Sequence, residues 1–152
     1  MLSWRNFSDL EPDLATLGEE IIERTGMVML GTLRKDGSPR ISPVEVLFSE
    51  GQLYLGMMWR SKKALDLLRD PRCTVHSATS NRDGSQGDFK VFGKAVPVSD
   101  LEERRRYSEA VYEKIGFKPE EPEFHLFSID VESAALVEFK NEEMTHRVWK
   151  AD

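Results

Sequence analysis

The sequence predicts a mainly β protein, in which six or seven antiparallel strands close into a small barrel with helices at its periphery. The first strands follow one another through short turns, which suit antiparallel pairing and not a doubly wound parallel sheet. Helical patterns occur only at the start of the chain, between the third and fourth strands, and between the fifth and sixth. With 152 residues, we expect one domain spanning residues 1–152.

The composition narrows the classes of function. Acidic residues outnumber basic ones and the formal charge is −6, so binding of nucleic acid through bulk charge is not expected. A single cysteine, Cys73, excludes an intrachain disulfide and a cysteine-cluster metal site, and its position in an apolar strand predicts burial. No apolar stretch is long enough for a membrane helix, and the first residues lack a signal peptide's apolar core. We therefore expect a cytoplasmic protein that binds neither membrane nor nucleic acid.

The first half of the chain contains a helix and then three strands. Pro12 and the apolar residues spaced three and four positions apart after it predict a helix that ends near Gly26 and packs across an open end of the sheet. An Asp-Gly turn joins a strand at residues 27–33 to one at 39–48. A second turn leads to the strand at residues 53–58, which completes an antiparallel meander.

The middle of the chain continues the barrel after a short helix at residues 61–70. Pro71 stops this helix, and residues 73–78 form the fourth strand. Residues 79–88 are too polar to offset the cost of ordering, which predicts a mobile surface loop. The fifth strand, at residues 89–98, is apolar on both faces apart from two lysines. We expect the core to cover one face of it and another subunit the other.

The last third of the chain begins with a helix and ends with two strands. Ser99-Asp100-Leu101-Glu102 reads as a capping box that opens a helix ending at Gly116. We expect its apolar face to consist of Leu101, Ala110, Val111 and Ile115. Residues 124–139 exceed one simple strand, which predicts a bend or bulge at Glu132-Ser133. A final strand is expected at residues 145–149.

Three consecutive arginines, Arg104, Arg105 and Arg106, lie in this last helix. Consecutive residues point in different directions around a helix, and four nearby glutamates neutralise the region. The run is therefore interpreted as a solvated helix surface and not as a nucleic-acid site.

A candidate anion site lies at the start of the helix at residues 61–70. The first N–H groups of a helix have no intrahelical acceptor and carry partial positive charge. Here Ser61 adds a hydroxyl, and Arg60, Lys62 and Lys63 add positive charge. Taken alone, the segment is also compatible with an ordinary serine N-cap followed by solvated lysines.

The strand at residues 39–48 favours the anion site. Alternation places Arg40 and Ser42 on one face, followed by apolar residues on the same face. If this strand pairs with the strand at residues 53–58, Arg40 and Ser42 would face the segment from Met58 to Ser61. A cationic side chain, two hydroxyls, a helix N-terminus and lysines would then meet at one corner of the sheet, which suits a dianionic phosphate.

Three stretches of the chain, at residues 30–43, 61–72 and 92–95, resemble the split β-barrel flavin-binding proteins related to pyridoxamine 5'-phosphate oxidase. The resemblance covers nearly the whole chain. It implies a homodimer with FMN, or alternatively a deazaflavin, in a groove at the subunit interface. Carried over residue by residue, it makes Lys63 and Ser61 the main phosphate ligands. The cofactor-binding candidates are Arg40, Ile41, Ser42, Pro43, Met58, Trp59, Arg60, Ser61, Lys62 and Lys63.

The chain also departs from the pattern of this family. The longer arginine-rich phosphate segment and the C-terminal substrate-binding arginine and histidine are not evident, so the resemblance does not extend to oxidation of vitamin B6. In addition, Asp66 replaces the asparagine that such proteins usually carry in this helix. An ionised aspartate cannot donate a hydrogen bond, so contacts in this corner are expected to differ.

Other chemistry has little support in the sequence. His76, His125 and His146 are dispersed and lack metal-site spacing, and the serines lack a Gly-x-Ser-x-Gly elbow. Trp59, Trp149 and Phe89 are candidates for contact with a cofactor ring or a substrate, although aromatic residues in strands more often belong to the core.

The sequence thus predicts an FMN-dependent oxidoreductase that acts on a small, unidentified substrate, with no catalytic residue assigned. A deazaflavin-dependent reductase, a non-catalytic flavin carrier or redox sensor, and a flavin-free barrel that binds a phosphate ligand remain as alternatives.

Overall fold

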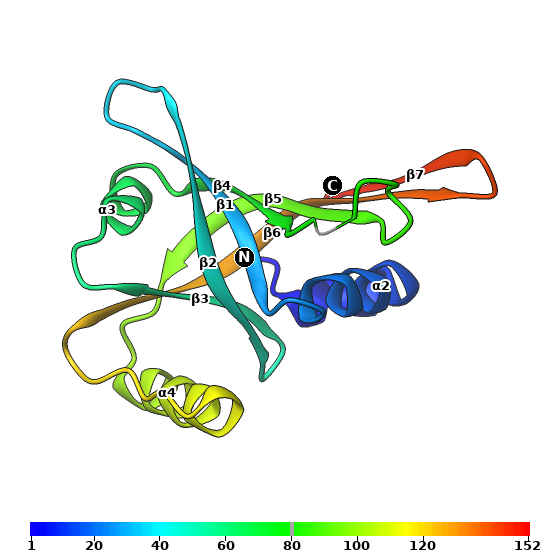
Figure 1. Ribbon diagram of the computed structural model, residues 1–152. Coiled ribbons are helices and arrows are strands. Elements are labelled where there is room, and N and C mark those ends of the chain that lie inside the picture. Colours follow the sequence, from blue (N-terminus) through cyan, green and yellow to red (C-terminus); the bar gives the residue numbers. More distant parts are fainter. Residues whose placement is uncertain (80) are drawn as a thin grey trace.

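In a computed structural model, which describes residues 1–79 and 81–152, seven antiparallel strands form one sheet with the order β3-β2-β1-β4-β5-β6-β7 (Figure 1). Because β3 also pairs with β6, six strands close into a barrel and β7 lies outside it. This confirms the predicted mainly β barrel. The strands are β1 (Met27–Leu33), β2 (Pro39–Ser49), β3 (Gln52–Met58), β4 (Arg72–Ser77), β5 (Asp88–Pro97), β6 (Phe124–Lys140) and β7 (Glu143–Lys150). The helices are α1 (Trp4–Leu10), α2 (Pro12–Glu23), α3 (Lys62–Arg69) and α4 (Leu101–Ile115).

Two helices at the N-terminus cover one end of the barrel, although only α2 was expected. Ser3 caps α1 through a capping box with Asn6, and this helix of 7 residues is too short to show a helical period. Helix α2 ends at Glu23, slightly before Gly26. Gly18 lies so close to Phe89 of β5 that a Cβ there would be 2.5 Å from the ring. A glycine therefore allows α2 to approach the barrel closely.

Phe89 and Trp149 belong to the core, as the alternative interpretation of strand aromatics held. Phe89 is fully buried and its ring centroid lies 6.2 Å from that of Trp4. Trp149 is half-buried, and its ring packs 5.0 Å from that of Phe7. Both rings therefore pack against other aromatic side chains of the core.

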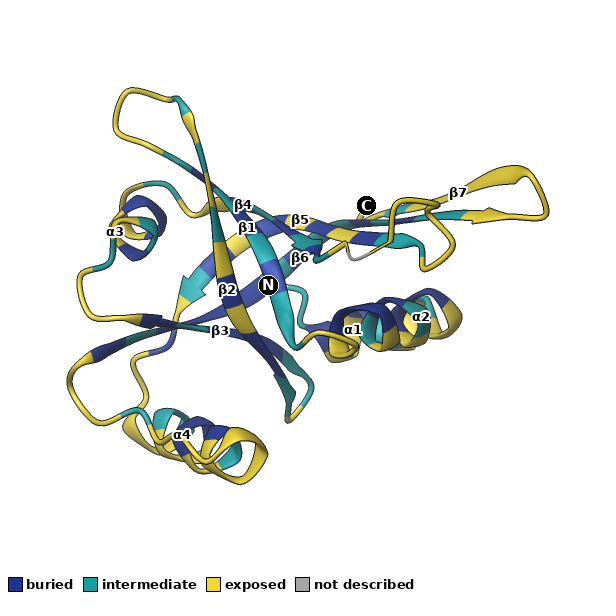
Figure 2. Ribbon diagram, in the orientation of Figure 1, coloured by how far each residue is buried: buried dark blue, intermediate teal, exposed yellow. Residues whose placement is uncertain are grey.

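Strand β6 has 17 residues and carries the predicted irregularity. Phe92 of β5 pairs with Ser133 and Gly93 pairs with Val131, so Glu132 of β6 has no pairing partner in β5. This confirms a β-bulge at the expected position. Beyond the bulge, β6 and β7 form a long hairpin that extends from the barrel, and β7 is exposed apart from Trp149 (Figure 2).

Helix α4 lies against the outside of the barrel, below β3 in Figure 1. Its N-cap is Asp100 and not Ser99, because the Asp100 carboxylate accepts a hydrogen bond from the N–H of Glu102 at 2.9 Å. The prediction of the residues that form the apolar face of α4 is also partly wrong. Leu101 and Ile115, at the two ends of the helix, are 71% and 49% exposed.

The middle of α4 provides its contact with the barrel. The buried residues of the helix are Tyr107, Ser108 and Val111. The Tyr107 ring lies 5.6 Å from that of Tyr54, and a Cβ on Gly56 of β3 would be 2.1 Å from the Tyr107 hydroxyl oxygen. An aromatic residue in the middle of the helix thus decides which face of α4 is buried.

All three consecutive arginines of α4 have carboxylate partners. Arg104 pairs with Glu121 at 2.6 Å, Arg105 with Glu102 and Glu109, and Arg106 with Glu50 at 3.0 Å. Arg104 also lies over the ring of Phe124, 4.1 Å from its centroid. The arginine run is therefore neutralised by its surroundings.

The predicted loop at residues 79–88 includes position 80, which lies outside the described residues. The carboxylate of Asp83 accepts hydrogen bonds from the backbone N–H and the hydroxyl of Ser85, and Arg24 donates to the carbonyl of Gln86 at 2.8 Å. Among the described residues, no helix is long and apolar enough to cross a membrane.

Candidate anion and cofactor site

The start of α3 lies where the barrel is split. Strands β2 and β3 pair only from Val46–Leu55 to Ser49–Gln52, whereas the other edge of β3 pairs with β6 from Tyr54 to Met58 (Figure 1). Arg40 therefore lies opposite Thr32 of β1. The expectation that Arg40 and Ser42 face the end of β3 through strand pairing is wrong, because the two strands diverge before reaching these residues.

Ser61 is the N-cap of α3, but its hydroxyl does not cap the helix. The backbone N–H of Ser61 donates to the carbonyl of Met58 at 3.1 Å, and its carbonyl accepts from the N–H of Leu65 at 3.0 Å. The Ser61 Oγ atom is inaccessible to solvent and has no hydrogen-bond partner among the described residues. A buried polar atom without a partner is unusual, which marks Ser61 as more than an ordinary cap.

Arg60, directly before Ser61, has a left-handed backbone with φ of 56°. This conformation is uncommon for a residue with a side chain and is frequent at functional sites. It directs the backbone N–H of Arg60 to His125 Nε2 at 3.1 Å, so β6 helps to fix the turn between β3 and α3.

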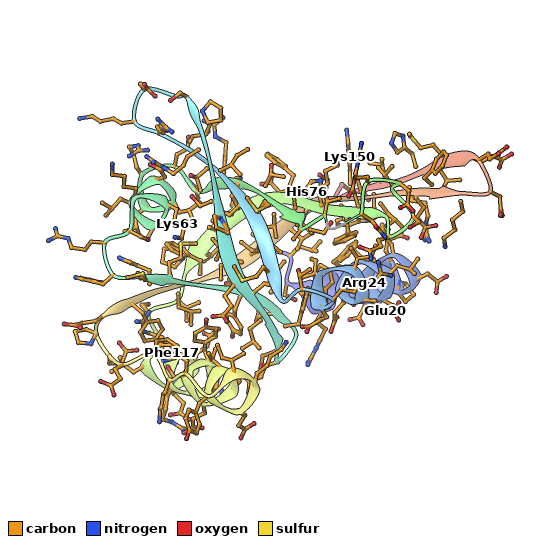
Figure 3. All side chains as sticks on the ribbon, viewed as in Figure 1. Glu20, Arg24, Lys63, His76, Phe117 and Lys150 are labelled. Carbon is orange, nitrogen blue, oxygen red and sulfur yellow. The ribbon has the colours of Figure 1, made fainter. Side chains whose placement is uncertain are left out.

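Three cations surround the start of α3 without counter-charges. Within the part of the chain that the structure describes, Arg60, Lys62 and Lys63 form no ion pair. Lys63 is half-buried and the other two side chains are exposed. Figure 3 shows Lys63 on α3, far from Lys150 at the end of β7. The first N–H groups of α3 add to this positive potential, because no side chain caps them.

The nearest acidic residue within α3, Asp66, is already committed to other cations. Its buried carboxylate accepts hydrogen bonds from Thr32 Oγ1 at 2.8 Å, Arg40 Nε at 2.7 Å and Arg69 Nη2 at 3.0 Å. Burial alone would raise the pKa of Asp66, but these three donors outweigh it and hold the pKa below its ordinary value. Arg40 thus reaches α3 through Asp66 and not through the helix N-terminus.

The remaining cofactor candidates form two groups. Ile41, Pro43 and Met58 point outward, and Ile41 and Met58 are 70% and 79% exposed. Ser42 is half-buried on the same face of β2 as Arg40. The structure therefore gathers Arg60, Ser61, Lys62 and Lys63 at one corner, places Arg40 and Ser42 on the inner face of β2, and leaves the apolar members at the surface.

Sequence reasoning missed a role for His125 of β6 in this corner. The exposed ring of Trp59 stacks on the His125 ring, with centroids 4.6 Å apart and planes 11° apart. Burial, and then the positive charge of Arg104, lower the pKa of His125. A neutral imidazole fits its role as acceptor from the Arg60 N–H. The long sequence separation of Trp59 and His125 gave no signal for this contact.

No group of three or more histidine, cysteine or carboxylate side chains is arranged to hold a metal ion in the described ranges 1–79 and 81–152. Cys73 is buried as expected, and burial raises the pKa of its thiol to about 12. This thiol is therefore unreactive at neutral pH.

The fold and this corner define a six-stranded barrel with a cationic helix start at its split. The family model described as pyridoxamine 5'-phosphate oxidase matches residues 18–138 of the chain. The chain belongs to this family. A search of curated protein sequences gave no match.

Solved structures of several kinds share the fold. A protein related to general stress protein 26 from Clostridium acetobutylicum is 14% identical, with 87% of this chain and 90% of that chain covered and a TM-score of 0.66. A nimC/nimA family protein from the same organism is 19% identical, with 91% and 94% covered and a TM-score of 0.65. The heme storage protein HutZ from Vibrio cholerae is 17% identical, with 81% and 90% covered and a TM-score of 0.65. At these identities the likeness concerns the fold alone.

Proposed function

We propose that this chain binds FMN with the cofactor phosphate at the start of α3, and that it acts as an oxidoreductase on a small substrate. The observation that carries the proposal is the Ser61 hydroxyl, which is buried without a partner beside uncapped helix N–H groups. A phosphate oxygen would supply the missing acceptor. Ser61 as a whole is half-buried, and in this proposal rotation about its χ1 turns the hydroxyl toward the bound phosphate.

The charges of the corner also fit a phosphate. A phosphate monoester carries nearly two negative charges at neutral pH. Arg60, Lys62 and Lys63 supply three positive charges that no carboxylate of the described chain offsets. In this proposal Ser61 and Lys63 hold the phosphate, and the β2 segment from Arg40 to Pro43 lies beside the flavin ring.

When bound, FMN supplies hydride or electron transfer, and the protein provides binding, orientation and the local charge. The stack of Trp59 on His125 offers a flat apolar surface beside the phosphate corner. The hydrogen bond from the Arg60 N–H to His125 holds this stack against the turn that leads into α3. Through this bond and stack, the chain's own residues would hold a bound phosphate at a fixed place relative to this surface.

The outer face of the sheet supports the homodimer that we propose. One row across it runs through Ile41, Gly31, Thr74 and Phe92, in which Ile41 and Phe92 are 70% and 42% exposed. The next row runs through His76, the exposed Lys90 and Ala135 to Val148, which is 64% exposed. Apolar residues on a continuous sheet face suit a second copy of the chain.

A titration tests the proposed function. The purified protein is titrated with FMN, a deazaflavin cofactor and hemin, with absorption spectra and calorimetry as readouts. We expect FMN to bind in the micromolar range or tighter and to be reduced by NADPH, NADH or a reduced deazaflavin. Tighter binding of hemin or of the deazaflavin would contradict the FMN assignment. Bound FMN that none of these donors reduces would instead indicate a flavin carrier or sensor.

Dilution tests the proposed dimer. If each flavin lies between two subunits, dilution to the monomer releases it, because ligand binding is then linked to dimerisation. The measurement is the flavin absorbance of the monomer and dimer fractions from size-exclusion chromatography. A monomer that stays yellow contradicts the shared site.

A further inference from the structure

A second feature of this corner is a cavity on the side of α3 that faces the β1–β2 turn. It is a shallow cavity, widely open to solvent, with a volume of about 380 Å³. Figure 1 shows this turn at the top of the molecule, above α3. The cavity is lined by five cationic residues, which are Arg34, Lys35, Arg40, Lys62 and Arg69. Neither Ser61 nor Lys63 lines it, whereas Lys62 of the phosphate corner does, so the cavity adjoins that corner.

The acidic residues of the cavity do not cancel its charge. Asp66 pairs with Arg40 and Arg69, as described above. The Asp36 carboxylate accepts hydrogen bonds from the backbone N–H and the hydroxyl of Ser38, at 2.9 and 2.6 Å, and forms no ion pair among the described residues. The cavity therefore contains more positive than negative charge.

The cavity has a built frame and is not only a set of surface lysines. Arg69 donates to the carbonyl of Leu33 at 2.6 Å as well as to Asp66, which ties α3 to the end of β1. Arg40 of β2 is held by Asp66 of α3 at 2.7 Å. Two guanidinium groups are thus fixed in the wall by a buried carboxylate, and cations held in position lose less entropy when an anion binds.

We infer that this cavity is a second anion subsite, which takes a phosphoryl or carboxylate group in addition to the phosphate at the start of α3. Lys62 lies in the first turn of α3 and also lines the cavity, so the two subsites adjoin. The inference rests on the proposed function, because the first subsite is the phosphate site proposed there. A ligand with two neighbouring anionic groups contacts both subsites, whereas a single phosphate contacts only one.

The test compares inorganic phosphate with pyrophosphate by titration calorimetry, at about 0.15 M salt, where long-range charge effects are screened. The test variant is Arg34→Gln/Lys35→Gln, whose side chains are exposed in a turn that is closed by backbone hydrogen bonds. The control is Lys118→Gln/Arg147→Gln, which removes the same two charge types from exposed positions that do not line the cavity.

We expect the unaltered protein to bind pyrophosphate at least about 10-fold tighter than phosphate. The Arg34→Gln/Lys35→Gln variant should lose about 10-fold in pyrophosphate affinity, which corresponds to about 1.4 kcal/mol, and less than about 2-fold in phosphate affinity. The control variant should change neither affinity by more than about 2-fold. Equal affinity for the two anions, or an equal loss in the control variant, overturns the inference.

Two further titrations separate the sources of the second anionic group. If the second anionic group belongs to the cofactor, the test variant loses more affinity for FAD, which has a diphosphate, than for FMN. If it belongs to a second molecule, the variant weakens pyrophosphate binding to FMN-saturated protein and leaves the ratio of FAD to FMN affinity unchanged. Both results support the subsite, and the absence of both effects contradicts it.

The outcomes also separate this inference from the proposed function. If the protein binds FMN and phosphate but does not prefer pyrophosphate, the result supports the proposed function and contradicts the second subsite. If the protein does not bind FMN but binds pyrophosphate through Arg34 and Lys35, the result supports the second subsite and contradicts the proposed function.

Discussion

The two basic clusters of this chain have the same number of cations and opposite surroundings. In α4, each of the consecutive residues Arg104, Arg105 and Arg106 has a glutamate partner. At the start of α3, Arg60, Lys62 and Lys63 have no ion-pair partner within the described residues. Some of the α4 partners lie within the helix, at three- and four-residue spacing from Arg105 and Arg106, and the others, Glu121 and Glu50, come from other segments.

This difference shows that the positions of the counter-charges, and not the density of cations in the sequence, decide where an anion can bind. The α4 arginines hold the protein's own carboxylates. The carboxylate nearest to the α3 cluster along the helix, Asp66, is occupied by Arg40 and Arg69. The free cations are therefore available for an external anion.

Removal of the Asp66 carboxylate has the largest expected effect. Asp66→Ala leaves Arg40 and buried Thr32 without their acceptor, and we expect a loss of about 3 to 5 kcal/mol in the free energy of unfolding, the range for breaking a buried ion pair. Urea unfolding followed by circular dichroism measures it. Asp66→Asn, which keeps the size and one acceptor, should lose less. A change below about 1 kcal/mol in Asp66→Ala would show that the network is dispensable.

The same network predicts a pH dependence. Because the folded-state pKa of Asp66 is lowered, its contribution to stability is complete above the ordinary aspartate pKa and is lost as the pH falls through the folded value. The stability difference between the unaltered protein and Asp66→Asn should stay constant from about pH 7 to 5 and shrink below about pH 4. A difference that persists at lower pH would contradict the charge-based explanation.

Lys63→Ala should weaken FMN binding by about 1.5 to 3 kcal/mol, or about 10- to 150-fold, through the loss of one charge-assisted hydrogen bond. Titration calorimetry measures the affinity, and a thermal unfolding curve serves as the control, since Lys63 has no ion pair to lose among the described residues. Unchanged affinity would remove Lys63 from the site.

Ser61→Ala should affect stability and FMN affinity differently. The Ser61 hydroxyl has no partner in the free protein, so its removal should leave the stability unchanged or slightly higher. FMN affinity should fall by about 1 kcal/mol, or about 5-fold. Equal losses of stability and affinity would indicate a structural role for the hydroxyl.

The smallest effect is expected in α4. Arg105→Ala breaks two exposed ion pairs, with Glu102 and Glu109, and should change neither the melting temperature nor FMN affinity measurably. A loss of FMN affinity comparable to that of Lys63→Ala would erase the distinction between the two clusters.

The positions of the strands and the antiparallel meander of the first three were largely predictable, because alternating apolar residues and tight turns are local signals. The β-bulge at Glu132 was also predictable, from the length of the apolar run. The short helix α1 was not, since its 7 residues complete too few turns to show a period. The buried face of α4 was partly mispredicted because Tyr107, a single aromatic residue, decides it.

For the site, the sequence correctly placed the cations and Ser61 around the start of a helix. It could not show that Arg40 pairs with Asp66, 26 positions away, because this contact depends on where β2 and β3 diverge. The contacts of His125 with Trp59 and Arg60 could not be predicted either, because they depend on the pairing of β3 with β6. Local chemistry can be read from a sequence, whereas partners that strand pairing brings together need the fold.

The pairing of β3 with β6 has a consequence for synthesis of the chain on the ribosome. Tyr54 pairs with Ser128, and the intervening chain includes α3, β4, β5 and α4. Until β6 emerges from the exit tunnel, β3 has an unpaired edge that another nascent chain can join. This closure between distant segments is slow relative to local hairpins. A chain in which β3 has not yet paired with β6 should therefore aggregate more readily than the closed barrel.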